Sequence, residues 1–338
     1  MKIAVIGCGA LGSYYGALLC RSGEECHFCL RTDYEHVKAH GVEILSPKGC
    51  FHIQPHCHEN PVTIGPCDLV LIGLKTTANP ILETWLPPLM GPDTRVLTLQ
   101  NGLGNEEALT SMVDPTRILG GLCFVCLNRV QPGVIRHMDH GLVVMGSWEP
   151  SEATGLEQIF ESFQKAGIPC RLTSNLQQAH WEKLMWNIPF NGLGVAAGLG
   201  HTAFTCDRSK LPTLHATGCM DAQALINHPD WLQRVGALME EIRRTANALG
   251  YAIEPGLSEQ LIEKTRSMGP YRASTLIDFD RGDPIELHSL FELPLQRARE
   301  VEVATPLLER LVVILQELQR RQEKGSLSSS SSARIKST

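Results

Sequence analysis

Short apolar segments alternate with longer amphipathic segments in the first half of the chain. Each apolar segment has the length of a buried strand, and the residues from Ala10 to Ser22 have the spacing of a helix. The predicted strands are Lys2–Ile6, Glu25–Leu30, Asp68–Leu74 and Thr94–Leu99. Strands that alternate with helices indicate a parallel sheet covered on both faces.

The pattern changes after Ile118 and again after Ser151. Three strand-like segments come first, separated by Gly and Pro, and we expect them to form a more antiparallel edge of the sheet. They are Cys123–Val130, Gly133–Met138 and Gly141–Trp148. Helical spacing then dominates. The predicted helices are Glu157–Ala166, a long helix from about Leu176, Trp231–Leu249 and Thr305–Glu323.

These patterns predict an α/β protein with two domains and a tail. Residues 1–170 form the parallel-sheet domain, and residues 171–324 form a mostly α-helical domain. The Ser-rich residues 325–338 have nothing to bury, so we expect them to be disordered.

Composition narrows the class of protein. The chain has 338 residues, 43% hydrophobic and 20% charged, with a formal net charge of −6. An acidic chain without a basic stripe is not typical of a nucleic-acid binder. No apolar run approaches the length of about 20 residues that crosses a membrane. The apolar N-terminus is interrupted by Gly7, Gly9 and Gly12, so it indicates a strand and turn, not a signal peptide. We expect a cytoplasmic protein.

Twelve cysteines raise the question of disulfides or metal. The two CxxC pairs, Cys26/Cys29 and Cys123/Cys126, lie in apolar strand-like segments, which favours buried structural thiols. The His56–His58 segment (HCH) could bind a metal. It stands in a polar stretch between Pro55 and Pro61, and we interpret it as a surface loop. No metal site is predicted.

A glycine-rich turn follows the first strand. Gly7, Cys8, Gly9, Ala10, Leu11 and Gly12 form a GxGxxG motif that opens the first helix. In a Rossmann-like domain the first glycine of such a motif permits a tight turn, and the third lets helix and strand approach closely. The second removes a side chain that would block a pyrophosphate, which then meets backbone N–H groups at the positive end of the helix. The motif therefore predicts a dinucleotide-binding site.

The end of the second strand bears on the choice of dinucleotide. An enzyme that uses NAD places Asp or Glu there to bind the ribose 2′-hydroxyl. Here the strand ends in Arg31, which can pair with a 2′-phosphate, while Asp33 comes slightly later. The sequence therefore predicts NADPH as the cofactor.

Further polar groups follow two other strands and line one predicted helix. Lys75 and Asn101 stand just after predicted strands, where ligands bind in open α/β sheets. Lys183, Asn187 and Asn191 are spaced i, i+4 and i+8, so a helix places them on one face. These three polar side chains stand among aromatic neighbours and would be costly to bury without a partner, which indicates that they line a cleft. Pro189, within the same helix, is expected to kink it or to free a carbonyl group.

These motifs, in this order and spacing, resemble the ketopantoate reductase family. A C-terminal segment from Arg272 to Leu287, with a serine turn leading to Pro-x-Glu, completes the resemblance. It implies that Lys183 is the general acid and that Glu286 orients Lys183 and the substrate hydroxyl. It also implies that Asn187, Asn191 and Ser274 bind substrate and that Asn101 lies at the nicotinamide. Reduction of a ketone leaves an alkoxide, for which a cleft lysine supplies both a proton and a positive charge.

The resemblance implies NADPH-dependent reduction of 2-dehydropantoate (ketopantoate) to pantoate, a step of pantothenate and coenzyme A biosynthesis. The segment after Asn191 departs from the family pattern, with about 15 extra residues before Asp221. Another branched 2-keto acid therefore stays an alternative, as do a related 2-hydroxy-acid or opine-type dehydrogenase and a catalytically inactive NADP-binding sensor. The partner is a small 2-keto acid, without nucleic acid or membrane, and the chain is a monomer or a homodimer.

Overall fold

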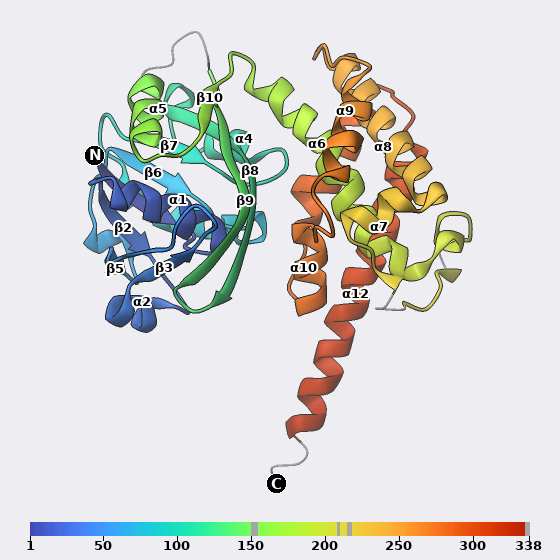
Figure 1. Ribbon diagram of the computed structural model, residues 1–338, viewed down its shortest axis with the longest axis horizontal. Coiled ribbons are helices and arrows are strands. Elements are labelled where there is room, and N and C mark those ends of the chain that lie inside the picture. The colour runs from blue at the N-terminus through green and yellow to red at the C-terminus, as the bar shows by residue number, and fades with distance from the viewer. Residues whose placement is uncertain (150–154, 208–209, 215–217, 335–338) are drawn as a thin grey trace. The chain divides into compact units, whose positions relative to one another are not determined.

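The structure is a computed structural model that describes residues 1–338 except 150–154, 208–209, 215–217 and 335–338, with side chains as far as Glu323. It divides into two compact units, Met1–Ala179 and His180–Thr338 (Figure 1). The division falls after Ala179, later than residue 170, where the sequence placed it. Strand β10 (Cys170–Leu172) pairs with the sheet and Leu176 packs against it, so this segment stays with the first unit.

The described strands of the first unit form one ten-stranded mixed sheet. The strands besides β10 are β1 (Lys2–Ile6), β2 (Glu25–Cys29), β3 (Val42–Leu45), β4 (Phe51–Ile53), β5 (His56–His58), β6 (Leu69–Ile72), β7 (Arg95–Thr98), β8 (Ile118–Gln131) and β9 (Val134–Ser147). Their order is β4-β3-β9-β8-β7-β6-β1-β2-β5, with β10 beside β9. Strands β8, β7, β6, β1, β2 and β5 run parallel, whereas β9 is antiparallel to β8. The predicted parallel sheet with a more antiparallel edge is confirmed.

The β8–β9 hairpin differs from the three separate strands predicted after Ile118. The second and third predicted segments join into the single strand β9, which runs through His140 and Gly141. Both residues have positive φ angles, of 65° and 123°, and the pairing with β8 shifts register nearby. A bulge absorbs extra residues and bends a strand without ending it, so the glycine here marks an irregularity and not a turn.

Alternate side chains of the central strand enter two different cores. Ile3 and Val5 of β1 belong to one apolar cluster, and Ala4 and Ile6 belong to another. Because successive side chains of a strand point to opposite faces, both faces of this sheet are buried. Helices α1 (Ala10–Arg21) and α5 (Leu156–Lys165) supply side chains to the first cluster, and α3 (Leu82–Trp85) and α4 (Asn105–Leu109) to the second.

The His56–His58 segment is a strand and not the predicted surface loop. It forms β5, which pairs with β2 at the edge of the sheet. His27 of β2 lies 3.0 Å from His58 (Nδ1 to Nε2), and the other ring nitrogen of His58 lies 2.7 Å from the Thr63 hydroxyl. Hydrogen bonding thus occupies both nitrogens of His58. The strand arises because edge pairing satisfies the backbone of a segment too short to show a periodic pattern.

The second unit is mostly helical, as predicted. Its α-helices among the described residues are α6 (Leu176–Ala196, which begins in the first unit), α7 (Ala222–Asn227), α8 (Pro229–Ala248), α9 (Leu257–Arg266), α10 (Ser274–Arg281), α11 (Leu293–Glu300) and α12 (Pro306–Arg334). Helix α2 (Tyr34–His40) belongs to the first unit. Helix α12 runs ten residues into the Ser-rich segment that was predicted to be disordered. Once a helix has formed, each further residue that is ordered adds one backbone hydrogen bond, so an existing helix can extend into such a segment. Residues 335–338 of that segment lie outside the described residues.

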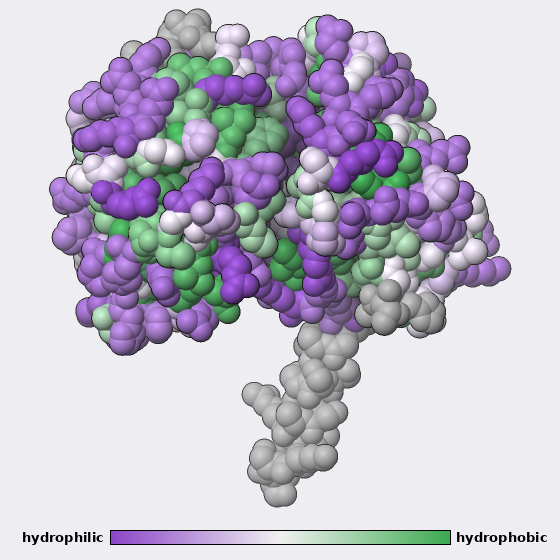
Figure 2. Space-filling view, viewed as in Figure 1, coloured by the Kyte–Doolittle hydropathy of each residue, from purple (hydrophilic) through white to green (hydrophobic). Residues whose placement is uncertain are grey.

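The surface is largely hydrophilic on the face that is shown (Figure 2), and the cysteines are free thiols. On the face shown in Figure 2, hydrophilic residues cover much of both units and apolar residues gather in smaller patches. All twelve cysteines are among the described residues and are free thiols, and the CxxC cysteines are buried as predicted. No helix of the described chain is both long and apolar enough to span a membrane.

Candidate active site

Four neighbouring strands of the first unit end at the same edge of the sheet. Cys29 of β2, Ile6 of β1, Ile72 of β6 and Thr98 of β7 lie in register with one another across the parallel strands. The loops that leave this edge contain the glycine turn and the predicted cofactor residues that follow the other three strands. The carboxyl edge of a parallel sheet is where such folds bind dinucleotides.

The glycine turn is shaped by close backbone contacts. Gly7 has φ +91°, and a Cβ there would lie 2.3 Å from the backbone nitrogen of Leu74. A Cβ on Gly12 would lie 2.3 Å from the Gly7 carbonyl oxygen, whereas nothing stands within 4 Å of a Cβ on Gly9. Gly7 and Gly12 are therefore required for packing, and Gly9 faces open space at the start of α1. The first N–H groups of a helix have no partner within it, so this turn fits a pyrophosphate.

An amide network joins the loops after β6 and β7. The Gln100 side-chain nitrogen donates to the Asn79 oxygen (2.6 Å), and the Asn105 side chain donates to the Asn101 carbonyl (3.1 Å). Gln100 and Asn105 are buried. The network holds the loop that contains the half-buried Asn101. Lys75 is exposed in the loop that follows β6. Sequence reasoning missed Asn79 and Asn105, because neither stands at a strand end.

Arg31 is exposed just beyond β2, and Asp33 is buried two residues later. Both carboxylate oxygens of Asp33 accept hydrogen bonds from Nη1 of Arg129, each at 2.8 Å. Burial and neighbouring thiols raise the pKa of Cys8 in the glycine turn, and the Asp33 charge adds to that rise. Arg129 thus pairs with Asp33, an acid that follows the end of β2, near the position where an NAD enzyme holds the ribose.

In the second unit, α6 places three of the predicted catalytic and substrate residues on one helix. Lys183 is half-buried and Asn187 and Asn191 are buried, at the predicted i, i+4, i+8 spacing. Pro189 lies inside the helix and offers no N–H to the Met185 carbonyl. The helix nevertheless continues to Ala196, so Pro189 does not end it.

Two of the predicted substrate residues meet in the structure. The Asn191 side-chain oxygen accepts hydrogen bonds from the Ser274 hydroxyl (3.2 Å) and the Thr275 backbone N–H (3.0 Å). Asn191 therefore caps the first turn of α10 and fixes Ser274 beside α6. Its remaining polar group, the amide nitrogen, is a donor. Glu286 is buried at 6% exposure and directly precedes a helical stretch that includes the π-helix η10 (His288–Glu292).

Aromatic side chains hold α6 in place within its unit. The Trp186 indole N–H donates to the Thr265 hydroxyl at 2.9 Å, and the Trp186 ring stacks on Phe190 with centroids 4.8 Å apart. Tyr271 lies against the same indole. The aromatic neighbours that the sequence placed around the polar row are thus packing partners, which keep one face of the helix for Lys183 and the two asparagines.

Sequence comparisons agree with this division of the chain. Residues 3–150 match the family described as ketopantoate reductase PanE/ApbA, and residues 209–319 match the ketopantoate reductase PanE/ApbA C-terminal family. The fold and the two matches define an oxidoreductase with a parallel-sheet unit followed by a helical unit. The chain belongs to the ketopantoate reductase family.

Named relatives and solved structures extend the comparison over nearly the whole chain. A 2-dehydropantoate 2-reductase of Nostoc is 35% identical over 332 residues, which cover 96% of this chain and 98% of the relative. The crystal structure of 2-dehydropantoate 2-reductase from Geobacter metallireducens is 39% identical with a TM-score of 0.83, covering 94% of this chain and 99% of that one. A D-mandelate dehydrogenase solved with NADH and anilino(oxo)acetate shares the fold at 18% identity, with a TM-score of 0.82 over 96% and 99% of the two chains.

Proposed function

We propose that this protein reduces 2-dehydropantoate to pantoate with NADPH. This is the reaction that the family resemblance implies, a step in the synthesis of pantothenate and coenzyme A. The observation that carries the proposal is the polar row on α6, with Asn191 tied to Ser274 by a hydrogen bond of 3.2 Å. Two relatives named as 2-dehydropantoate 2-reductases, 35% and 39% identical, support it over nearly the whole chain.

The reaction requires a hydride at the keto carbon and a proton at its oxygen. The bound cofactor supplies the hydride. Lys183 donates a proton to the carbonyl oxygen, which becomes the hydroxyl of the product, and the lysine then regains a proton from solvent. The lysine's charge also stabilises the oxygen as negative charge develops on it. Glu286 orients Lys183 and the substrate hydroxyl, and Asn187, Asn191 and Ser274 hold the rest of the substrate.

The residues of the first unit fit NADPH. Gly7, Cys8, Gly9, Ala10, Leu11 and Gly12 would hold the pyrophosphate against the start of α1. Arg31 would pair with the 2′-phosphate, while Arg129 cancels the charge of Asp33, so the local balance favours a phosphate over a bare hydroxyl. Lys75 and Asn101 would contact the rest of the cofactor at the edge of the sheet.

A second candidate is reduction of another branched 2-keto acid. The sequence after Asn191 is expected to depart from the family pattern before Asp221, although the C-terminal family match begins at residue 209. A dehydrogenase named for mandelate shares this fold, although 18% identity carries only the fold. An inactive NADP-binding sensor is a weaker alternative, since Lys183 and Glu286 are both present.

The test is a panel of 2-keto acids assayed with NADPH and with NADH. We expect the highest kcat/KM with 2-dehydropantoate and NADPH. A higher value with another branched 2-keto acid would replace the substrate but keep the class of reaction. Loss of NADPH oxidation with every 2-keto acid, despite tight NADPH binding, would favour the sensor.

A further inference from the structure

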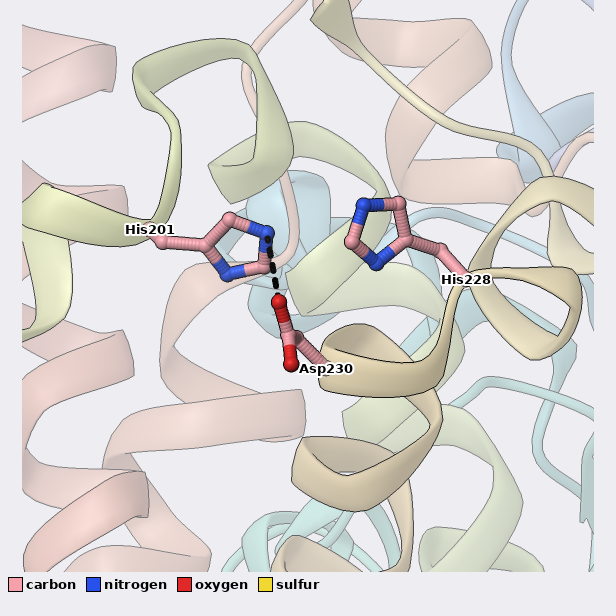
Figure 3. A group of neighbouring side chains, drawn as sticks. All are labelled: His201, His228 and Asp230. Carbon is pink, nitrogen blue, oxygen red and sulfur yellow. Dashed lines mark ion pairs between the residues drawn. The ribbon is translucent and has the colours of Figure 1, made fainter.

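A second group of polar side chains lies in the helical unit, outside the proposed active site. His201 stands in the short 3-10 turn η7 (His201–Phe204), His228 precedes α8, and Asp230 lies in its first turn. One ligand atom of each side chain lies within 4.8 Å of the others. Figure 3 shows the two rings facing each other, with the Asp230 carboxylate directed toward them from below.

Two further observations indicate that this group has room for a ligand. Nδ1 of His228 is buried and has no hydrogen-bond partner, which in a native fold calls for an ion, a water or another explanation. His201 and Asp230 also line a cavity of about 360 Å³ together with Gln233, Arg234, Ala237 and Leu307. The cavity gives an ion or a water molecule a path to the side chains of His201 and Asp230.

Neighbouring aromatic packing fixes one of the rings. The buried Trp231 stacks on His201 with ring centroids 4.4 Å apart. Burial, followed by the charge of Arg234, lowers the pKa of His201. A neutral imidazole is the form that binds a metal.

We propose that His201, His228 and Asp230 form a binding site for a borderline divalent cation of the zinc and cobalt type. Two imidazoles and one carboxylate suit such a metal, and the cavity leaves a fourth position for water. Ligands of a tetrahedral zinc at about 2.0–2.2 Å lie roughly 3.3 Å apart, so rotation of the exposed Asp230 side chain must close the group slightly. The cation would join η7 to the start of α8.

Arg234 is the group that opposes this cation. Its Nη1 donates to Nδ1 of His201 at 2.6 Å, which puts the ring proton on Nε2, and its charge repels a metal. The guanidinium also lies over the rings of Phe204 and Trp231, beside the proposed site. Metal binding therefore competes with Arg234, which predicts an effect of opposite sign from the loss of a ligand.

The experiment measures Co²⁺ binding to the full-length protein by absorption titration and by the shift in melting temperature. Wild type should bind one Co²⁺ per chain without the sulfur charge-transfer absorption that thiolate ligands would give. His201→Ala, His228→Gln and Asp230→Asn should each weaken binding at least about tenfold. Arg234→Gln should strengthen it. His36→Gln is the matched control, because His36 and His40 form an exposed pair on α2 that could bind metal adventitiously.

The melting temperature in EDTA, together with circular dichroism, reports whether each variant is folded. Folded ligand variants that bind Co²⁺ as wild type does would overturn the proposal. So would weaker binding in His36→Gln but not in Asp230→Asn, or a thiolate spectrum. Because these readouts do not involve catalysis, they stand or fall separately from the proposed reduction.

Discussion

The two units build their candidate sites in different ways. The proposed cofactor edge of the first unit is built mainly on backbone, a glycine turn and loops that leave four strands in register, with a few side chains such as Arg31 beside it. The candidate site of the second unit is made of side chains: the α6 row of Lys183, Asn187 and Asn191, together with Ser274, which comes from a distant segment and bonds to Asn191. Backbone recognition suits a cofactor that many enzymes share, while side chains set the chemistry. Substitutions should therefore act on binding in the first unit and on turnover in the second.

The largest effect is expected from Lys183→Ala. It removes the proton donor and its charge, so kcat should fall by about 10² to 10⁴. NADPH affinity, measured by fluorescence titration, should stay within a factor of about two, because the proposed cofactor residues lie in the other unit. Lys264→Ala, an exposed lysine of α9, is the matched control.

Glu286→Ala sharpens the same comparison, since it should raise the substrate KM and lower kcat together, with partial recovery in Glu286→Gln. If Lys183→Ala folds and keeps near-normal kcat, the general acid lies elsewhere. If it loses NADPH binding, the division of labour between the units is wrong.

A smaller effect is expected at the predicted 2′-phosphate site. Arg31→Ala should raise the KM for NADPH by roughly 10- to 150-fold, the equivalent of losing about 1.5–3 kcal/mol from one charged contact, and should change the KM for NADH little. Arg129→Ala should also lower the preference for NADPH over NADH, but by less than Arg31→Ala, because it leaves the buried Asp33 carboxylate uncompensated.

Steady-state kinetics with both cofactors measures this preference. Arg136→Ala, an exposed arginine on the same hairpin, is the control and should have no effect. Equal use of NADPH and NADH by the wild type would contradict the assignment of Arg31.

The smallest effect separates packing from binding within the glycine turn. Gly12→Ala should lower the free energy of unfolding by about 1–3 kcal/mol, because its Cβ would overlap the Gly7 carbonyl oxygen. Gly9→Ala should keep normal stability without cofactor, since nothing stands within 4 Å and its φ is −74°, but should bind NADPH more weakly. Urea unfolding and NADPH titration distinguish the two. Normal NADPH binding by Gly9→Ala would remove the pyrophosphate from this turn.

The sequence by itself determined the features that depend on local patterns. The strands that end at Ile6, Cys29, Ile72 and Thr98 appear in the structure within two residues of their predicted bounds, because a buried strand must be an apolar run. The i, i+4, i+8 spacing of the α6 row is likewise a property of one helix. The glycine turn was visible because its backbone allows few other residues.

Only the tertiary structure decided the features that join distant segments. The β5 strand, the single long β9, the Asp33–Arg129 pair and the convergence of His201 with His228 and Asp230 leave no periodic mark in the sequence. Asp33 and Arg129 lie on α2's start and on β8, and nothing in either local pattern indicates the other. Such contacts depend on how the sheet and helices pack, since a side chain's partner is fixed by three-dimensional proximity and not by position along the chain.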